Sequence, residues 1–349
     1  MAKNSSPSVT SRRKSEHVKI VLEKDIAFRR KTNGFEMLEF EHNALPEINF
    51  SEVNPDCVFL NKPLSMPLMV SCMTGGYEDA GRINRILAEA CEEYRVAMGV
   101  GSQRQALEDT SYHKSFTVVR RVAPTIPLIG NLGAPEVAQL HDASPVQRLV
   151  DMIGADAFAV HLNPLQEFLQ PEGHPNYRGV LKGIELLVKN LSVPVIVKEI
   201  GAGISRSVAK RLVDVGVRII DVAGAGGTSW AGIEILRGNE HELKESFWDW
   251  GIPTVEALWN IAPLRKDVRQ LTLISSGGIT NGVHIAKSIA LGADLAASAR
   301  LIMQAVHGGG KKRVRQLFNR WSRELKGAMF LVGARTIEEL QQQTLHRLH

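Results

Sequence analysis

The sequence predicts an α/β fold, a (β/α)8 TIM barrel with an N-terminal extension. Eight short apolar runs are each followed by small or polar residues and then by a helical pattern. Their starts lie about 33 residues apart on average, which is the length of one strand and helix unit. Near-continuous apolar strands alternating with helices are typical of a parallel sheet buried on both faces. Eight strands favour a closed barrel over a doubly wound open sheet, whose usual GxGxxG opening is absent after the first run.

The composition is that of an ordinary globular protein with a large core. The chain has 349 residues, of which 44% are hydrophobic and 23% are charged, so disorder as the main state is excluded. The longest apolar stretch, residues 291–306, is interrupted by Asp294 and Arg300 and falls short of the ~18 to 20 apolar residues of a membrane helix. We therefore expect no membrane partner.

The N-terminus and the cysteines predict a cytoplasmic protein. Basic residues near the start are not followed by an apolar segment, so this region does not resemble a secretory signal. Three cysteines without CxxC spacing favour reduced thiols over a disulfide framework or a zinc site. The net charge of +5 permits either nucleic acid or a small polyanion as partner, and the positions of the charges must decide.

We expect four parts along the chain. Residues 1–12 are polar and predict a flexible N-terminal arm, and residues 13–66 form a segment that leads into the barrel. The stretch 12–31 carries basic residues around apolar ones and predicts an amphipathic helix in this segment. The barrel takes residues 67–335, and residues 336–349 form a C-terminal tail.

The predicted strands coincide with the eight apolar runs, at 67–73, 97–102, 126–131, 157–163, 194–199, 219–226, 272–277 and 295–300. Helical faces lie between them. Apolar residues from Ile83 to Tyr94 recur at spacings of three and four, and similar stripes occupy 253–262 and 281–291. The interval after the sixth strand is the longest, and its surplus at 230–251 predicts a lid over the site.

Glycines and polar residues gather at the C-terminal ends of the predicted strands, where the active sites of such barrels lie. Gly277 and Gly278 follow the seventh strand and predict a cradle for a phosphate group. Four residues at other strand ends suit one edge of a flat heteroaromatic cofactor such as flavin: Thr74, Ser102, Asn131 and Lys198. Other interpretations stay open, because Lys198 could pair with Glu199, and Thr74 or Asn131 taken singly could be turn or capping residues.

Six motifs in the chain closely resemble those of type 2 isopentenyl-diphosphate isomerase. They are RKSEH at 13–17, MTGG at 73–76, GSQR at 101–104, HLNPLQE at 161–167, VKE at 197–199 and AGAGGTSW at 223–230. The resemblance runs from about residue 12 to about residue 335, and HLNPLQE is its most specific motif. It implies an FMN-binding barrel with a substrate-binding helix in the segment 13–66, a bound magnesium ion, and interconversion of isopentenyl and dimethylallyl diphosphate.

Carried over position by position, the resemblance assigns three groups of residues. Around FMN it implies Met73, Thr74, Gly75, Ser102, Asn131, Lys198, Thr228, Gly277, Gly278, Ser298 and Ala299. On the substrate it implies Arg13, Lys14, His17, Ser102, Gln103, Arg104, His161, Asn163 and Gln166. It places Glu167 on the Mg2+ ion.

Elementary chemistry agrees with this division. A diphosphate is strongly anionic, so it needs a cluster of cations such as Arg13, Lys14 and Arg104, together with a hard metal ion held by a carboxylate and by the phosphates. Glu167 is suited to that role, although a carboxylate in the first turn of a helix is an alternative interpretation. His17 and His161 could likewise be structural histidines.

The implied reaction moves a double bond in an unactivated hydrocarbon. A proton must add to one carbon and leave another through a cation-like transition state, a task to which ordinary side-chain acids are poorly matched. Reduced flavin, whose N5 can give or take a proton, is the expected acid-base catalyst. We expect Gln166 to relay protons and Trp230 to line the apolar pocket, and Trp230 could equally be a packing residue.

Three rival functions differ in the residues they require. Hydroxyacid oxidases place a histidine and an arginine after the sixth strand, and related nucleotide dehydrogenases place a cysteine there, but residues 226–230 contain none of these. A nucleic-acid-binding barrel could use the basic arm and the basic residues at 311–315, but no aromatic residues are interleaved among these charges. We therefore expect a small diphosphate and no nucleic acid as partner.

Two further expectations follow from the resemblance. NADPH would reduce the flavin as an external reductant, since the chain has no GxGxxG for a resident nicotinamide site. The chain would form a homo-oligomer, a tetramer or an octamer, in which the N-terminal arm could complete a neighbour's site.

Overall fold

The protein is described by a computed structural model that covers residues 9–238 and 245–348. Eight parallel strands close into a barrel in the order β10-β11-β4-β5-β6-β7-β8-β9. All eight lie within the predicted runs or overlap them, which confirms the predicted barrel. Their bounds are β4 Leu68–Val70, β5 Ala97–Gly99, β6 Leu128–Gly133, β7 Ala157–His161, β8 Val195–Lys198, β9 Ile219–Asp221, β10 Thr272–Ser276 and β11 Leu295–Ser298.

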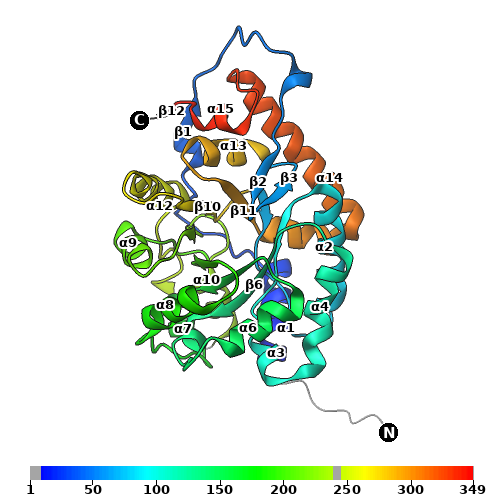
Figure 1. The fold of residues 1–349 in the computed structure, drawn as a ribbon, viewed down its shortest axis with the longest axis vertical. Helices are drawn as coiled ribbons and strands as arrows, with labels where there is room; N and C mark the ends of the chain where they lie inside the picture. The colour runs from blue at the N-terminus through cyan, green and yellow to red at the C-terminus, as the bar shows by residue number, and fades with distance from the viewer. Residues whose placement is uncertain (1–8, 239–244, 349) are drawn as a thin grey trace.

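The helices that cover the barrel have the amphipathic stripes seen in the sequence. In α2 (Ala80–Tyr94), for example, Ile83, Leu87 and Cys91 are buried on one face. The other covering helices are α4 His113–Val122, α6 Ser144–Ile153, α8 Val180–Asn190, α9 Arg206–Asp214, α12 Thr254–Ile261, α13 Gly282–Ala290 and α14 Arg300–Leu331. Figure 1 shows this layer around the strands.

Short helices occupy several of the loops at the C-terminal ends of the strands. They are α3 Arg104–Glu108, α5 Ala134–Val137, α7 Pro164–Leu169 and α10 Trp230–Arg237. Since α10 begins the predicted lid at 230–251, part of that segment is helical, while its residues 239–244 lie outside the described part of the chain.

The barrel interior is filled by apolar residues in its lower layers. Met69, Ile129, Ile196, Ile219 and Ile274 belong to one buried cluster inside the barrel. Phe59 and Leu64, from the hairpin of β2 (Cys57–Phe59) and β3 (Lys62–Leu64), join this cluster and close the N-terminal end of the barrel. The interior is therefore a packed core rather than a channel, and only its C-terminal end can be open to a ligand.

The segments outside the barrel differ from the sequence prediction. The N-terminal helix α1 spans Val9–Glu23, so it begins three residues before the predicted stretch and ends eight residues before its end. Residues 1–8 of the predicted arm lie outside the described chain. The predicted tail contains α15 (Ile337–Gln341) and β12 (Leu345–Arg347), and β12 pairs with β1 (Leu38–Phe40). This pair lies at the upper end of the molecule in Figure 1, and α1 lies in its lower half.

Among the residues that the structure describes, no helix is long and apolar enough to cross a membrane.

Candidate active site

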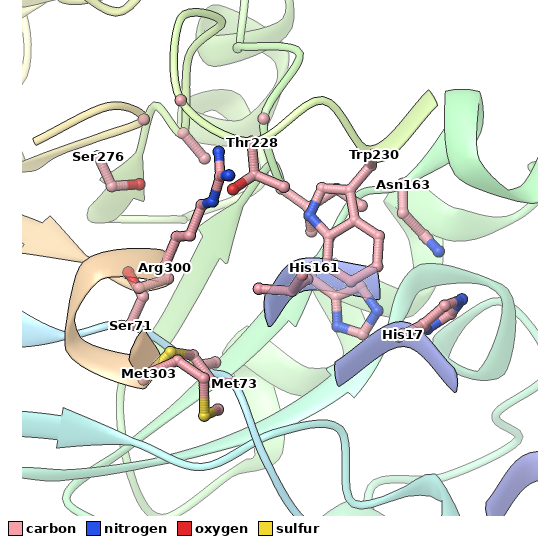
Figure 2. A pocket seen from close by; sticks show the side chains of 18 of the residues that line it. His17, Ser71, Met73, His161, Asn163, Thr228, Trp230, Ser276, Arg300 and Met303 are labelled. Carbon is pink, nitrogen blue, oxygen red and sulfur yellow. The ribbon is translucent and has the colours of Figure 1, made fainter. Parts of the chain in front are cut away.

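A cavity of about 610 Å³ opens at the C-terminal end of the barrel, beneath α1. This volume lies in the range of small-molecule and cofactor sites. Nearly all predicted site residues line it: Arg13, Lys14, His17, Met73, Gly75, Ser102, Arg104, Asn131, His161, Asn163, Gln166, Glu167, Lys198, Thr228, Trp230, Gly277, Gly278, Ser298 and Ala299. In Figure 2, His17, His161, Asn163 and Trp230 lie on one side of this cavity and Ser71, Ser276 and Arg300 on the other.

Two predicted residues, Thr74 and Gln103, do not line the cavity. Thr74 lies in the loop after β4, and its buried hydroxyl donates to Oδ1 of Asn84 in α2. The Gln103 amide donates to the Leu149 carbonyl (3.1 Å) and accepts from Asn131 N (3.0 Å), so its side chain ties α6 to β6. The structure therefore shows no contact of the Gln103 side chain with the cavity. The motif that contains Gln103 did not reveal that this side chain points into the protein.

The floor of the cavity is a polar layer of inward-facing strand residues. Because side chains alternate along a strand, the residue two positions after each apolar interior residue also points inward. This alternation places five cavity-lining side chains directly above the apolar core: Ser71, Asn131, His161, Lys198 and Ser276. The layer presents neutral hydrogen-bonding groups and one lysine, as the sequence predicts for a flat heteroaromatic ligand.

His161 is held as a neutral imidazole. Its burial, together with the positive charges of Lys198 and Lys14, lowers its pKa to about 3. Its Nδ1 lies 2.9 Å from Asn131 Oδ1, which can only accept, so Nδ1 carries the proton and Nε2 keeps a free lone pair. His161 can therefore orient or accept a hydrogen bond, but it does not supply positive charge to an anion.

The positive charges sit at the mouth of the cavity, on α1 and in the loop after β5. Lys14 donates to the carbonyls of Gly75 (2.7 Å) and Ser102 (2.8 Å), and its burial with Arg13 nearby lowers its pKa to about 7. Arg104 pairs with Glu136 (2.9 Å), which also lines the cavity and was not predicted. These groups are placed where an anionic ligand would meet them on entering.

Glu167 lies in a dense hydrogen-bonded cluster at the start of α7. Its carboxylate accepts from Asn163 Nδ2 (2.9 Å), Gln170 Nε2 (3.0 Å) and His174 N (2.7 Å). Within 9–238 and 245–348, no group of three or more histidine, cysteine, aspartate or glutamate side chains could hold a metal. This donor set fits Mg2+ only as a partial site, in which one carboxylate is completed by ligand phosphate oxygens and water.

A second network, built on Glu234 of α10, was missed by the sequence analysis. Glu234 Oε1 lies 2.9 Å from His17 Nε2 and accepts from Gln166 Nε2 (3.1 Å), and its other oxygen pairs with Arg237 (2.6 Å). Burial opposes ionisation of Glu234, yet the hydrogen bond with His17 and the charge of Arg237 hold its pKa below the usual range. No sequence signal could have found it, since Glu234 lies more than two hundred residues from His17.

Trp230 packs edge-on against His17, with ring centroids 5.4 Å apart. Both side chains line the cavity. Trp230 therefore contacts the N-terminal helix and faces the site at once, so packing and ligand contact are not alternatives here.

The loops after β9, β10 and β11 meet at one side of the cavity, where the sequence predicts a cradle for a phosphate group. Gly277 and Gly278 have φ values of 106° and 74°, and a Cβ on either would come within 3 Å of the backbone of the loop after β9. Arg300, which begins α14, lines the cavity, and its buried Nε has no hydrogen-bond partner among the described residues. Figure 2 shows its guanidinium pointing toward Thr228. Close-packed glycines, a helix N-terminus and an arginine with an unpaired Nε are features that suit a terminal phosphate.

Comparison with known proteins decides the family. A family described as FMN-dependent dehydrogenase matches residues 159–347. The isopentenyl-diphosphate delta-isomerase of Chlorobaculum parvum is 46% identical over 354 residues, covering 98% of each chain. That of Pseudescherichia vulneris is 46% identical over 333 residues, covering 95% of each. The chain belongs to the FMN-dependent isopentenyl-diphosphate delta-isomerase family.

Solved structures of the wider fold group are more distant. The lactate oxidase of Pediococcus acidilactici superposes with a TM-score of 0.68 at 18% identity, covering 95% of this chain and 87% of the oxidase. A mandelate oxidase gives a TM-score of 0.66 at 17% identity, covering 97% and 96%. At this level of identity the likeness shows the barrel fold alone, and the isomerase family is assigned from the sequence relatives.

Proposed function

We propose that this chain interconverts isopentenyl diphosphate and dimethylallyl diphosphate, with reduced FMN in the cavity and Mg2+ on the diphosphate. The observation that carries the proposal is that one cavity combines a hydrogen-bonding floor, on which Lys198 is the cavity-lining charged residue, with a cluster of cations at its mouth. A flat cofactor fits the floor, and a diphosphate fits the mouth. NADPH serves as the external reductant of the flavin in this proposal.

The chain's own residues have distinct roles toward the two ligands. Lys198 would bind the pyrimidine edge of the flavin, and Gly277, Gly278 and Arg300 would hold its phosphate. When bound, the reduced flavin supplies an electron-rich ring whose N5 can give or take a proton beside an alkene. Gln166, which is hydrogen-bonded to Asn163 and Glu234, is the proposed proton relay.

The substrate is held by charge at one end and by shape at the other. Arg13, Lys14 and Arg104 bind the diphosphate, and Glu167 supplies a protein ligand to its metal ion. Trp230 and His17 close the cavity under α1 and exclude water from the hydrocarbon end. A dry site favours a reaction with a cation-like transition state, because water would otherwise compete for the developing charge.

Two broader expectations are carried forward with this proposal. The three cysteines are free thiols, which is consistent with a cytoplasmic location. Assembly into a tetramer or an octamer remains a prediction.

The test is anaerobic turnover of isopentenyl diphosphate with FMN, Mg2+ and a reductant, omitting each in turn. We expect product only in the complete mixture, and a Glu167→Gln variant that needs at least tenfold more Mg2+ while it still binds FMN. Glu185→Gln is the matched control, since Glu185 pairs with Lys189 on the outside of α8. Product formation without flavin would refute the proposal, and an unchanged Mg2+ requirement would remove Glu167 from the metal.

A further inference from the structure

Asp221 is a buried carboxylate that the proposed function does not use. It ends β9 inside the barrel, and its side chain is fully buried without lining the cavity. Its Oδ2 has no hydrogen-bond partner among the described residues. Burying a charged group with an unsatisfied oxygen is costly, so such a residue calls for a physical reason.

The partners of Asp221 are the two floor residues on the neighbouring strands. Its Oδ1 accepts from Ser276 Oγ (2.5 Å) and from Ala223 N (3.2 Å). Its Oδ2 lies 3.8 Å from Lys198 Nζ, a distance that makes an ion pair but is too long for a hydrogen bond. The strand register puts Asp221 directly opposite Lys198. Asp221 is thus fixed on one side and faces the ammonium group on the other.

Lys198 and Asp221 are the charged pair of the polar layer that forms the cavity floor. His161 is neutral, and Ser71, Asn131 and Ser276 carry no charge. Lys198 also donates to the carbonyl of Glu199 (2.6 Å), which holds its ammonium at the cavity wall. The surroundings have a low dielectric constant, so the charges of this pair act strongly on any group that lies on the floor. Such a group feels the positive potential of Lys198, reduced by the negative potential of the slightly more distant Asp221.

We propose that Asp221 is a positioning residue that acts through Lys198: it fixes the ammonium beneath the flavin and partly neutralises it, which lowers the reduction potential of the bound flavin. This inference rests on the proposed placement of FMN over Lys198. An uncompensated lysine would strongly stabilise the two added electrons and their negative charge. The pair weakens that stabilisation and leaves the reduced ring electron-rich, which is the property that proton transfer to an alkene requires.

The test is the two-electron reduction potential of FMN bound to four full-length holoproteins: wild type, Asp221→Asn, Lys198→Met and the double variant. Asp221→Asn removes the negative charge while keeping shape and the Ser276 contact. We expect the reduction potential of this variant to rise by at least about 30 mV. For a two-electron couple this rise corresponds to a tenfold larger equilibrium constant for reduction.

In the Lys198→Met background, we expect Asp221→Asn to change the equilibrium constant for flavin reduction less than twofold. Burial raises the pKa of Asp221, and the Lys198 charge and the Ser276 hydrogen bond oppose that rise. Without the lysine, the buried acid takes up a proton and becomes equivalent to asparagine in charge. The two backgrounds therefore separate an effect transmitted through Lys198 from a direct effect of Asp221.

Asp294→Asn is the matched control, because Asp294 pairs with Arg265 at the opposite end of the barrel and should leave the potential unchanged. If Asp221→Asn does not fold, Asp221→Ser replaces it in the same measurement. An unchanged or lowered potential, or an equal shift in both backgrounds, overturns the inference. A wild-type protein that binds no FMN instead overturns the proposed function, so the two failures are distinguishable.

Discussion

Lys14 is a cavity residue whose charge changes near neutral pH. Burial and the charge of Arg13 lower its pKa to about 7, although it remains hydrogen-bonded to two carbonyls. A diphosphate favours the charged ammonium, so above pH 7 the free protein must take up a proton when the ligand binds. The affinity for the diphosphate should therefore depend on pH in a range where the ligand itself no longer titrates.

We expect the Kd for isopentenyl diphosphate to rise between pH 7 and pH 9, by up to about tenfold per pH unit. In Lys14→Gln the Kd should be higher than in the wild type at pH 7 and nearly constant over this range, because glutamine has no proton to gain. Calorimetric titration of the oxidised holoproteins measures the Kd of the wild type and of Lys14→Gln at each pH. Lys19→Gln, an exposed lysine on the same helix that does not line the cavity, is the control. A variant that retains the wild-type slope would contradict the assignment of Lys14.

Residue by residue, the sequence predicts the parts of the site that lie at strand ends. His161, Asn163 and Lys198 follow apolar runs directly, so the alternation of a buried strand already places them at the cavity. The sequence analysis did not predict three other charged residues at or beside the cavity, which are Glu234, Asp221 and Arg300. Their significance comes from partners on distant segments or on neighbouring strands, and no local pattern contains that information.

At the scale of single elements, α1 covers the cavity through side-chain contacts with the barrel loops. Arg237 of α10 has a nearly buried side chain that pairs with Glu234 (2.6 Å), Glu172 (3.2 Å) and Glu16 of α1 (3.2 Å). The pair of His17 with Glu234 adds a second connection between α1 and α10. The helix is thus held over the end of the cavity proposed for the substrate, whereas the end proposed for the flavin is built by the barrel itself.

Arg237→Ala should therefore loosen α1 without emptying the flavin site. Removing one partner of a buried charge cluster leaves carboxylates unpaired, which costs about 3 to 5 kcal/mol in comparable cases. We expect the KM for isopentenyl diphosphate to rise at least tenfold while the Kd for FMN changes less than twofold. Steady-state kinetics and fluorescence titration of FMN measure these, with Lys210→Ala on the outside of α9 as control. Equal losses in both constants would show that the cluster supports the barrel rather than α1.

The limits of the helix predictions have a physical cause at this scale. The stripe in α2 is regular because one face packs on the sheet, so its position follows from periodicity alone. In α1, Lys14 contacts the loops after β4 and β5, and Glu16 and His17 contact α10, so the helix is positioned by residues far away in the sequence. Its apolar spacing alone did not locate either end.

For the whole molecule, the barrel could be predicted because every repeat of the chain carries the same signal. Each strand is buried on both faces, so it is apolar throughout, and each helix shows one apolar face. The β1 and β12 pair was missed because it joins residues about three hundred positions apart. The long element α14 consists of two helical stretches joined by a kink at Gly309 and Gly310, whose backbone is non-helical, in agreement with the low helix propensity of glycine.

The basic stretch at 311–315 has a structural role in the assembled molecule. Lys311 and Arg315 of α14 pair with Glu89 and Glu93 of α2. These ion pairs join two helices that lie more than two hundred residues apart in the sequence. Two of the four basic residues in this stretch are therefore paired with acidic residues of another helix.

In the proposed reaction the flavin acts as an acid-base group without net redox change. This is tested by proton NMR of isopentenyl diphosphate in D2O, in large excess over holoprotein that has been reduced once and then kept anaerobic with Mg2+. We expect many turnovers per flavin, with deuterium in the methyl group formed from the terminal CH2 and no product from oxidised holoprotein. Product limited to one turnover per reduced flavin, or equal turnover with oxidised flavin, would contradict it.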